Sequence, residues 1–496
     1  MFNNAEFYFL INFKSMENEL TPSIFKATFI KFFEHNLTHD QNELVTQLEA
    51  FLKLKEPQQL FVLKGYAGTG KTSVLGAFVK TLSHFKVKTK LLAPTGRAAK
   101  VFSLKSTKEA LTIHKQIYWR DSKVDEFSKM TLAKNLHTNT VFIVDEASMI
   151  IGDPAYGNTS LQNDTAFSAR NLLEDLIEYV FSGINCRLIL LGDEGQLPPV
   201  GSDFSPALSL DYLKNNFPLV GISSFSLTEV LRQDEASGIL KNATLLRGIT
   251  GKEFKFHTKG FSDFIQLPGE EFQDELDAAL SQNGVEETLV ITRSNKRANA
   301  YNNQIRARIL WFEEAVCAGD CLMVVKNNYY WIDESSKMGF IANGESLKVI
   351  RVKKIEEQYG FEFLRLIVKF IDYDEIPEME VLVFSESLQV EAPSISRARL
   401  KELFFAIEAD HLDERNKQKR YNLILKNPYF NALQVKYAYA VTCHKSQGGQ
   451  WSTIFIDQGY IDPELNDLEY NRWLYTAITR ATEKVYLINF PEENFI

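Results

Sequence analysis

A glycine-rich segment, Gly65-Tyr-Ala-Gly-Thr-Gly70-Lys71-Thr72, follows the apolar run from Leu60 to Leu63 and precedes an amphipathic stretch that reaches about Phe85. This order predicts a strand, a turn and a helix. Glycines in such a turn let successive backbone N–H groups point at a phosphate, and the helix N-terminus adds partial positive charge. Lys71 would reach the β- and γ-phosphates, and the Thr72 hydroxyl would bind Mg²⁺. The segment therefore predicts a binding site for a nucleoside triphosphate.

Two further strand ends carry polar residues suited to hydrolysis. Asp145 and Glu146 follow the apolar run from Val141 to Val144. We expect this run to lie beside the strand of the glycine-rich turn, where Asp145 would hold Mg²⁺ through water and Glu146 would orient and deprotonate the attacking water. Gln196 lies in the loop after Gly192, where its amide would touch the γ-phosphate or that water.

Composition limits the class of protein. The chain has 496 residues, 45% of them hydrophobic, a net charge of −9 and four scattered cysteines. We expect about three domains, reduced thiols and a cytoplasmic location, and Cys317 and Cys321 alone do not predict a zinc site. No apolar run approaches the roughly 20 residues that cross a bilayer, so no membrane partner is expected. Residues 1–14 lack a basic start and a cleavage site, so they do not predict a secretion signal.

Short apolar runs alternate with helical stretches along most of the chain, which predicts an α/β class with doubly wound parallel sheets. Two sheets are needed, one before about residue 221 and one after it. Between residues 302 and 431 the pattern changes to alternating strands, which predicts a small antiparallel barrel. A charged helical pattern follows from Ser396 to about Leu425, and we interpret its charges as a solvated face.

Further motifs follow in an order typical of one family. Thr38-His-Asp-Gln41 is similar to a motif that reads adenine through its glutamine. Segments similar to later motifs of the same family are Ala93 to Ala99, Thr112 to His114, Leu227 to Gln233, Val441 to Gly448 and Leu474 to Ala481. With the glycine-rich segment, this set resembles a superfamily 1 helicase of the RecD/Dda type, over roughly residues 37 to 490. The N-terminal segment and the polar insertion at residues 152–185 depart from the family, and the insertion is assigned no role.

The resemblance implies a domain organisation. Residues 1–36 would be an N-terminal segment, and 37–221 a first RecA-like domain (1A) with a pin-like 1B insertion at about 115–140. Residues 222–305 and 432–496 would form a second RecA-like domain (2A). Residues 306–431 would form a 2B-like insertion, an SH3-like β-barrel with helices.

The resemblance also implies that ATP lies between the two RecA-like domains and that arginines of the second domain stabilise charge on the transferred phosphoryl group. The implied catalytic residues are Lys71, Asp145, Glu146, Gln196, Arg232 and Arg480. The implied nucleotide contacts are Gln41, Gly65, Tyr66, Ala67, Gly68, Thr69, Gly70, Lys71, Thr72, Ser73 and Gly449. Mg²⁺ would be held by Thr72 and Asp145.

Single-stranded DNA would cross both domains, and the family's activity implies 5′→3′ movement, unwinding of tailed duplex DNA and a role in repair or recombination. The implied nucleic-acid contacts are Pro94, Thr95, His114, Thr442, His444 and Lys445. Four aromatic residues could stack on bases or pack in the core: Tyr118, Trp119, Tyr329 and Tyr330.

Three alternatives stay open. The chain could be an ATP-gated DNA-binding subunit that moves only inside a larger repair, recombination or defence complex. It could be an RNA helicase, since such motors contact backbones and 2′-hydroxyls without an obvious sequence signature. A fused nuclease is disfavoured, because the sequence contains no second acidic metal-binding motif.

Overall fold

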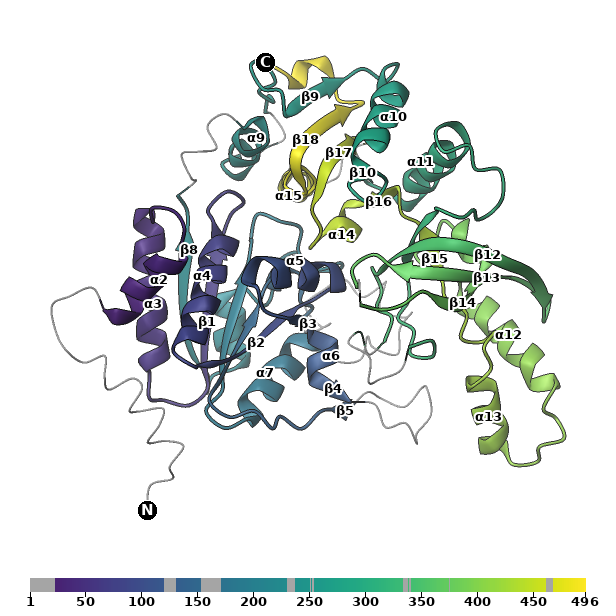
Figure 1. Cartoon of the computed structure of the whole chain (residues 1–496), viewed down its shortest axis with the longest axis horizontal. Coiled ribbons are helices and arrows are strands. Elements are labelled where there is room, and N and C mark those ends of the chain that lie inside the picture. Colours follow the sequence, from purple (N-terminus) through teal and green to yellow (C-terminus); the bar gives the residue numbers. More distant parts are fainter. Residues whose placement is uncertain are drawn as a thin grey trace. The chain divides into compact units, whose positions relative to one another are not determined.

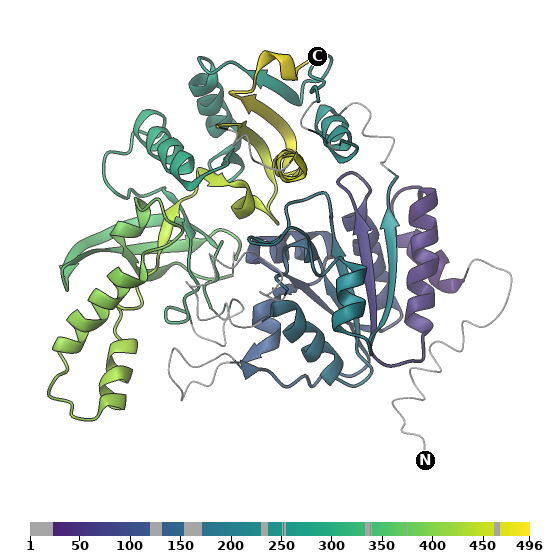
Figure 2. The same cartoon turned by 180° about the vertical axis from the view of Figure 1, so that it is seen from behind.

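The computed structural model describes residues 23–119, 131–152, 171–229, 237–249, 251, 254–332, 338, 340–373, 375–460 and 467–496. The chain divides into two compact units. Unit 1 comprises Met1–Pro94, Ala98–Arg120 and Met130–Glu235, and unit 2 comprises Thr95–Arg97, Asp121–Lys129 and Ala236–Ile496. Figures 1 and 2 show the helices and strands of both units.

Unit 1 is built on a six-stranded parallel sheet in the order β3-β2-β6-β7-β1-β8. Its strands are β1 (Gln59–Gly65), β2 (Lys88–Ala93), β3 (Ala110–Thr112), β6 (Thr140–Val144), β7 (Arg187–Gly192) and β8 (Gly221–Leu227). The central strands are buried along nearly their whole length, as expected for a parallel sheet covered on both faces.

Successive side chains of β1 face opposite sides of the sheet, and each side has its own hydrophobic core. Phe61 and Leu63 pack with α2 (Ile24–Phe32), α3 (His39–Lys53), α4 (Lys71–His84) and α5 (Gly96–Ser106). Leu60 and Val62 pack with the elements of the other face, which are α6 (Ile113–Ile117), η1 (Ala147–Met149), α7 (Leu172–Ser182) and α8 (Leu210–Asn216).

The structure corrects two predictions about this sheet. The predicted second domain begins at residue 222. Strand β8 pairs with β1 in parallel, so residues 222–227 belong to the first sheet instead. Strand β7 lies between β1 and β6, so the strand that ends at Asp145 is not beside the strand of the glycine-rich turn. Crossover connections allow two consecutive strands to be separated within a sheet. The strand order therefore cannot be inferred from local patterns in one sequence.

The region expected to form a pin contains a short antiparallel pair, β4 (Tyr118–Trp119) with β5 (Thr131–Leu132). The connection at residues 120–130 lies outside the described residues, so the pin stays a prediction. Helix α7 lies in the insertion to which the sequence assigned no role, and it buries Leu173, Leu176 and Val180 against the sheet.

Unit 2 contains a second parallel sheet in the order β16-β10-β17-β18-β9. Its strands are β9 (Phe264–Leu267), β10 (Thr288–Thr292), β16 (Ala440–Thr442), β17 (Trp451–Asp457) and β18 (Ala481–Ile488). Its helices are α9 (Gly238–Arg247), α10 (Phe272–Asn283), α11 (Asn295–Arg308), α14 (Cys443–Ser446), α15 (Asp467–Ile478) and η6 (Glu492–Asn494). The two parallel sheets agree with the expected α/β class.

A five-stranded antiparallel sheet is inserted between α11 and β16, in the order β14-β13-β12-β11-β15. Its elements are β11 (Cys321–Val324), β12 (Ser346–Gln358), β13 (Phe361–Phe370), β14 (Met379–Phe384), η5 (Ser385–Leu388) and β15 (Val435–Tyr437). A bridge between Val383 and Leu433 joins the β14 edge to the segment before β15, so the sheet curls toward closure. The SH3 likeness stays a prediction.

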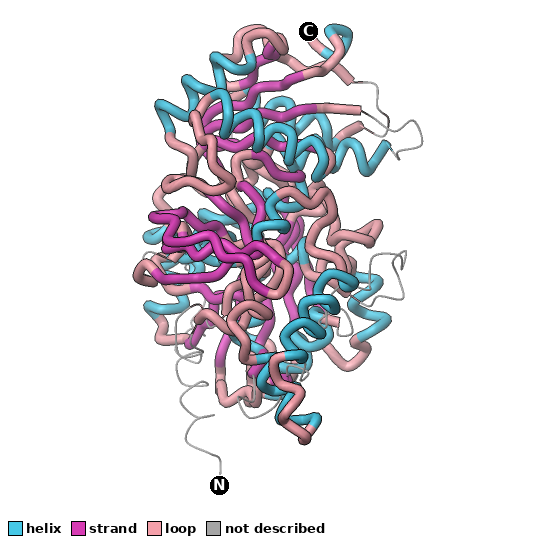
Figure 3. Tube along the Cα trace, turned by 90° about the vertical axis from the view of Figure 1, so that its right-hand side faces the viewer, coloured by secondary structure: helices cyan, strands magenta, loops and turns pink. Residues whose placement is uncertain are grey.

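The charged segment after η5 forms two helices rather than one, α12 (Arg397–Ala409) and α13 (Lys417–Leu425). Figure 3 marks helices in cyan and strands in magenta along the chain trace. Among the described residues, no helix combines the length and the apolar character that crossing a bilayer requires.

Candidate nucleotide site and nucleic-acid contacts

The glycine-rich turn connects β1 to α4 as the sequence predicts. Gly68 and Gly70 have φ angles of 78° and 76°, in the left-handed region that glycine adopts without strain. Gly65 is required for a different reason, because a Cβ atom there would lie 2.9 Å from the Lys71 side chain. The turn thus places the stem of Lys71 directly over the end of β1, and the N-terminus of α4 at the loop.

The ammonium group of Lys71 is held inside this loop. Its Nζ donates to the carbonyl oxygens of Gly65 and Tyr66, the latter at 2.8 Å, and lies 3.5 Å from Asp193 Oδ2. Asp193 is only 1% exposed and comes from the end of β7, the strand next to β1. The loop therefore fixes the lysine by one buried carboxylate and two carbonyls. Asp193 was not predicted as a site residue, although the sequence places it at the end of an apolar run.

Gln41 lies in α3 and connects this helix to the glycine-rich loop. Thr38 caps α3, and Thr38 and Gln41 form a reciprocal capping box. The Gln41 side chain is fully buried, accepts a hydrogen bond from Thr38 N at 3.1 Å and donates to Thr69 O at 3.0 Å. Gln41 thus ties α3 to the loop, and its contact with adenine stays a prediction.

Asp145 and Glu146 follow β6 at the same edge of the sheet. The Glu146 N–H donates to Asp145 Oδ1 at 2.8 Å, and Glu146 has a φ angle of 52°. A left-handed non-glycine residue is uncommon, and such conformations concentrate at functional sites. Burial and, secondarily, the charge of Glu146 raise the pKa of Asp145 to about 6. Burial destabilises the ionised form of this carboxyl group, and a bound cation would stabilise it.

Gln196 lies in the loop after β7. The Asp193 side chain accepts a hydrogen bond from Gly195 N at 2.9 Å, and Gln196 N donates to Asp193 O at 3.3 Å, so Asp193 shapes this loop as well as facing Lys71. The Gln196 side chain is 5% exposed, and its Oε1 has no hydrogen-bond partner among the described residues. A buried amide oxygen without a partner is costly, and a ligand or water could satisfy it.

Helix α3, which carries Gln41, also binds residues 228 and 229, shortly before Arg232 in the sequence. Asp40 Oδ2 accepts hydrogen bonds from Thr228 N and Oγ1, both at 2.8 Å, and from Glu229 N at 3.0 Å. Asp40 N in turn donates to Glu229 Oε2 at 3.1 Å. Arg232 itself lies outside the described residues, so its role stays a prediction.

Replacing Asp40 by alanine is expected to lower the turnover number for ATP about tenfold while ATP binding changes little. The substitution removes three charge-assisted hydrogen bonds that restrain residues 228–229, and a loss of about 1.4 kcal/mol in positioning corresponds to about tenfold in rate. Steady-state hydrolysis measures the effect. Glu43→Ala, an exposed position on the same helix, is the matched control. Equal turnover in the Asp40 and Glu43 variants would contradict the positioning role.

Arg480, at the end of α15, is 3% exposed. Its guanidinium donates to Thr476 O at 3.0 Å and to Gly449 O at 3.3 Å. The structure thus brings together two residues that the sequence assigned to nucleotide contact, Arg480 and Gly449. Their contact with ATP stays a prediction.

The expected nucleic-acid contacts come from both units. Pro94 and Thr95 follow β2 directly in the chain, and His114 lies in α6 of unit 1, where burial lowers its pKa to about 4. A histidine with such a pKa is neutral near pH 7, so His114 would contact a nucleic acid by stacking or by a neutral hydrogen bond rather than by charge.

In unit 2, Thr442 ends β16, and His444 and Lys445 lie in the short helix α14 that follows. Burial, and secondarily the charge of Lys436, lowers the pKa of Lys445 to about 8. Thr442 and Lys445 line one narrow pocket with Asn295 and Asn299 of α11. The two asparagines were not identified from sequence, because polar residues in a helix are usually solvated.

The aromatic candidates differ in their surroundings. Tyr118 donates to Asp175 at 2.6 Å and packs against the unit 1 core, so it does not present a free ring. Tyr329 stacks on Phe340 with ring centroids 4.8 Å apart, whereas Tyr330 is 39% exposed. Tyr330 remains the best placed of these three for base stacking. The side chain of Trp119 lies outside the described part of the chain.

A second unusual carboxyl group lies in the antiparallel sheet region. Glu345 is 2% exposed and accepts a hydrogen bond from the Tyr373 hydroxyl at 3.2 Å, and its Oε2 has no partner among the described residues. Burial, followed by the negative charge of Asp372, raises the pKa of Glu345 to about 8. The folded state therefore favours the protonated form, whereas an unfolded glutamate ionises near pH 4.5.

Because the folded pKa is the higher one, the contribution of Glu345 to stability is complete below about pH 4.5 and is lost as the pH rises to about 8. The unfolding free energy of the wild type should fall between pH 6 and pH 8.5. In Glu345→Gln this decrease should be smaller by roughly 2–3 kcal/mol. Urea unfolding at both pH values measures this. Exposed Glu357→Gln is the control, and an identical pH dependence of wild type and Glu345→Gln would contradict the prediction.

Comparison with known proteins finds two family models that match parts of the chain. Residues 36–154 match the model of an AAA domain, and residues 437–488 match that of a UvrD-like helicase C-terminal domain. The ATP-dependent DNA helicase dda of Enterobacteria phage T4 is 24% identical, over 88% of this chain and 95% of its own length. These matches agree with the resemblance of the chain to superfamily 1 helicases of the RecD/Dda type. The two matched segments contain the glycine-rich loop with Asp145 and the motif residues Thr442 and Arg480.

The other similar proteins are less informative. An uncharacterized protein of Acanthamoeba polyphaga mimivirus is 23% identical, over 86% of this chain and 94% of its own length. An uncharacterized protein of Methanocaldococcus jannaschii is 24% identical over 92% of this chain, which spans 39% of that protein. Among solved structures, the Pif1 helicase of Candida albicans is 17% identical with a TM-score of 0.41, covering 93% of this chain and 96% of its own. Bacteroides Pif1 bound to single-stranded DNA is 16% identical with a TM-score of 0.44, covering 93% and 95%.

Proposed function

We propose that this chain is an ATP-dependent DNA helicase that moves 5′→3′ along single-stranded DNA and unwinds tailed duplex DNA. The observation that carries the proposal is the loop at the end of β1, where Lys71 is held by Asp193 at 3.5 Å beside the glycine turn. The relationship to the phage helicase over 88% of this chain supports the same activity.

The residues at this loop fit Mg²⁺ with ATP. Within the described residues, no cluster of three or more His, Cys, Asp or Glu side chains could hold a metal alone, so the metal would depend on phosphate oxygens as well. The Thr72 hydroxyl and the Asp145 carboxylate are oxygen donors of the kind that Mg²⁺ prefers alongside phosphates. When bound, the metal neutralises charge on the β- and γ-phosphates.

The chain's own residues then have separate tasks. Lys71 moves from loop carbonyls to the phosphates, and the turn N–H groups bind the same oxygens. Glu146 accepts a proton from the attacking water, and Gln196 orients that water through its unpaired amide oxygen. Arg232 and Arg480 add positive charge to the transferred phosphoryl group, which makes hydrolysis depend on domain closure.

Single-stranded DNA would be held through its phosphates by Thr95, Thr442 and Lys445. Such contacts are independent of sequence, and affinity should fall steeply with salt. A phosphate near Lys445 would restore the pKa that burial lowers to about 8.

A strand-displacement assay with the purified chain tests the proposal. We expect unwinding of 5′-tailed duplex DNA that requires ATP, with little unwinding of 3′-tailed DNA or of 5′-tailed RNA. Unwinding of the 3′-tailed substrate would overturn the polarity, and preference for RNA would favour an RNA helicase. ATP hydrolysis stimulated by DNA without any unwinding would favour a subunit that requires protein partners.

A further inference from the structure

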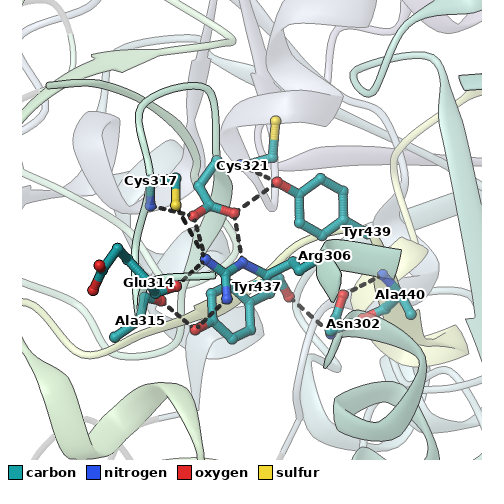
Figure 4. Close-up of polar contacts among 10 residues, drawn as sticks. Asn302, Arg306, Glu314, Ala315, Cys317, Cys321, Tyr437, Tyr439 and Ala440 are labelled. Carbon is teal, nitrogen blue, oxygen red and sulfur yellow. Dashed lines mark hydrogen bonds and ion pairs between the residues drawn. The ribbon is translucent and has the colours of Figure 1, made fainter. Parts of the chain in front are cut away.

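Two stretches of chain connect the parallel sheet of unit 2 to the antiparallel sheet, and they meet at one buried cluster of polar residues. The outgoing stretch runs from α11 to β11, through residues 309–320. The returning stretch runs from β15 to β16 and includes Tyr437 and Tyr439. Figure 4 shows that Arg306 of α11 lies between the two stretches.

Arg306 and Asp320 form the centre of this cluster, and their side chains are 7% and 0% exposed. Arg306 Nε and Nη2 donate to the two Asp320 oxygens, each at 2.9 Å, in a bidentate pair. The remaining acceptor positions of Asp320 are used by Cys317 N at 2.7 Å and by the Tyr439 hydroxyl at 2.8 Å. The carboxylate thus binds the outgoing and the returning stretch at once.

The guanidinium group of Arg306 also contacts both the outgoing and the returning stretch. Arg306 Nη2 donates to Glu314 O at 2.7 Å on the outgoing stretch, and Nη1 lies 3.3 Å from the Tyr437 hydroxyl on the returning one. The guanidinium also stacks on the Tyr437 ring, 4.4 Å from its centroid.

One turn earlier on α11, Asn302 completes the joint. It donates to Tyr437 O at 3.2 Å and to Ala440 O at 2.9 Å, and it accepts from Ala440 N at 2.7 Å. Asn302 thus binds both ends of the returning stretch, Tyr437 in the antiparallel sheet and Ala440 in the parallel sheet.

A buried ion pair is a weak source of net stability, because the two charges lose their hydration, but it tolerates few alternative geometries. A joint held only by apolar contacts could slide, whereas this one would leave a buried charge without a partner if either stretch moved. We infer that the Arg306–Asp320 cluster locks the antiparallel sheet to the second parallel sheet as one rigid body. On the proposed function, it is a positioning centre that makes the antiparallel sheet follow each nucleotide-driven movement of the motor domain.

The decisive variant is Arg306→Met with Asp320→Leu, which replaces the pair by apolar side chains of similar volume and so avoids an unpaired charge. The matched control is Arg365→Met with Glu356→Leu, a bidentate pair within the antiparallel sheet whose atoms lie 2.6 and 3.3 Å apart. Arg306→Lys keeps the charge but loses the bidentate geometry, and an intermediate effect is expected. Thermal unfolding first verifies that each variant is folded.

Distances between spin labels measure the rigidity directly. Labels at Lys296→Cys on α11 and Glu378→Cys before β14 report across the joint, in a Cys317→Ser background, since Cys186, Cys321 and Cys443 are buried. We expect one narrow distance distribution in the wild type and the control, and a distribution at least twice as wide in the Arg306/Asp320 variant. An equally narrow distribution in that variant would overturn the inference.

The activity readout is the ratio of base pairs unwound to ATP hydrolysed. We expect this ratio to fall at least fivefold in the Arg306/Asp320 variant, while hydrolysis stimulated by single-stranded DNA stays within twofold of wild type. An unchanged ratio would overturn the positioning role. If the wild type neither unwinds DNA nor hydrolyses ATP, the proposed function fails, but the label distances still decide whether the joint is rigid.

Discussion

Lys71→Ala is expected to reduce ATP hydrolysis about 10³-fold or more while leaving binding to single-stranded DNA nearly unchanged. The lysine is the charged group that the loop aims at the phosphates, and removal of one preorganised donor from a phosphoryl or oxyanion site typically costs 10²–10³-fold in turnover. The effect should be at the upper end, because Asp193, 1% exposed and 3.5 Å from Nζ, would lose its cationic partner. Phosphate release at saturating single-stranded DNA measures hydrolysis, and fluorescence anisotropy measures DNA binding.

The chain offers a close control in Lys64→Ala. Lys64 precedes the loop on the same strand, and its ammonium pairs with Glu194 at 2.6 Å, next to the aspartate that faces Lys71. The Glu194 side chain is 42% exposed, so this pair contributes little to stability. Turnover of Lys64→Ala should stay within about twofold of wild type. Normal turnover in Lys71→Ala would show that nucleotide binds elsewhere.

The local parts of this site could be predicted from sequence because each depends on a short pattern. The apolar run, the glycines and the amphipathic helix lie within residues 60–85, and the structure forms β1, the turn and α4 there. The Asp145-Glu146 pair is likewise at the end of its strand. Two parallel sheets followed from the alternation of apolar runs with helices, and the structure contains both.

Relations between distant segments could not be predicted in the same way. Strand β7 lies between β1 and β6, which puts Asp193 rather than Asp145 against Lys71, and strand order leaves no trace in a local pattern. Arg306 and Asp320 are separated by loop residues and look like ordinary surface charges in the sequence. Their burial depends on Tyr437 and Tyr439, more than a hundred residues later. The apolar spacing of Leu173, Leu176 and Val180 in α7 could have been recognised, but the polar residues before it obscured the pattern.

Glu146→Gln is expected to slow hydrolysis about 10²–10⁴-fold, the range that a positioned general base contributes, while ATP still binds. Glutamine keeps the shape of the side chain but cannot accept a proton from water. The substitution also removes the charge that, second to burial, raises the pKa of Asp145, so affinity for Mg²⁺ with ATP should be unchanged or higher. Single-turnover hydrolysis and binding of a fluorescent ATP analogue separate the two effects.

Glu194→Gln is the matched control for this substitution. Glu194 follows Asp193 at the end of β7 as Glu146 follows Asp145 at the end of β6, yet it pairs with Lys64 and is largely exposed. If both glutamates lay near the reaction, both variants would be slow, whereas a single base predicts that only Glu146→Gln is. The left-handed φ angle of 52° at Glu146 supports the single base, because the fold maintains a costly conformation at that residue. Loss of ATP binding in Glu146→Gln would instead assign the residue to holding the metal, and full turnover would exclude it from the reaction.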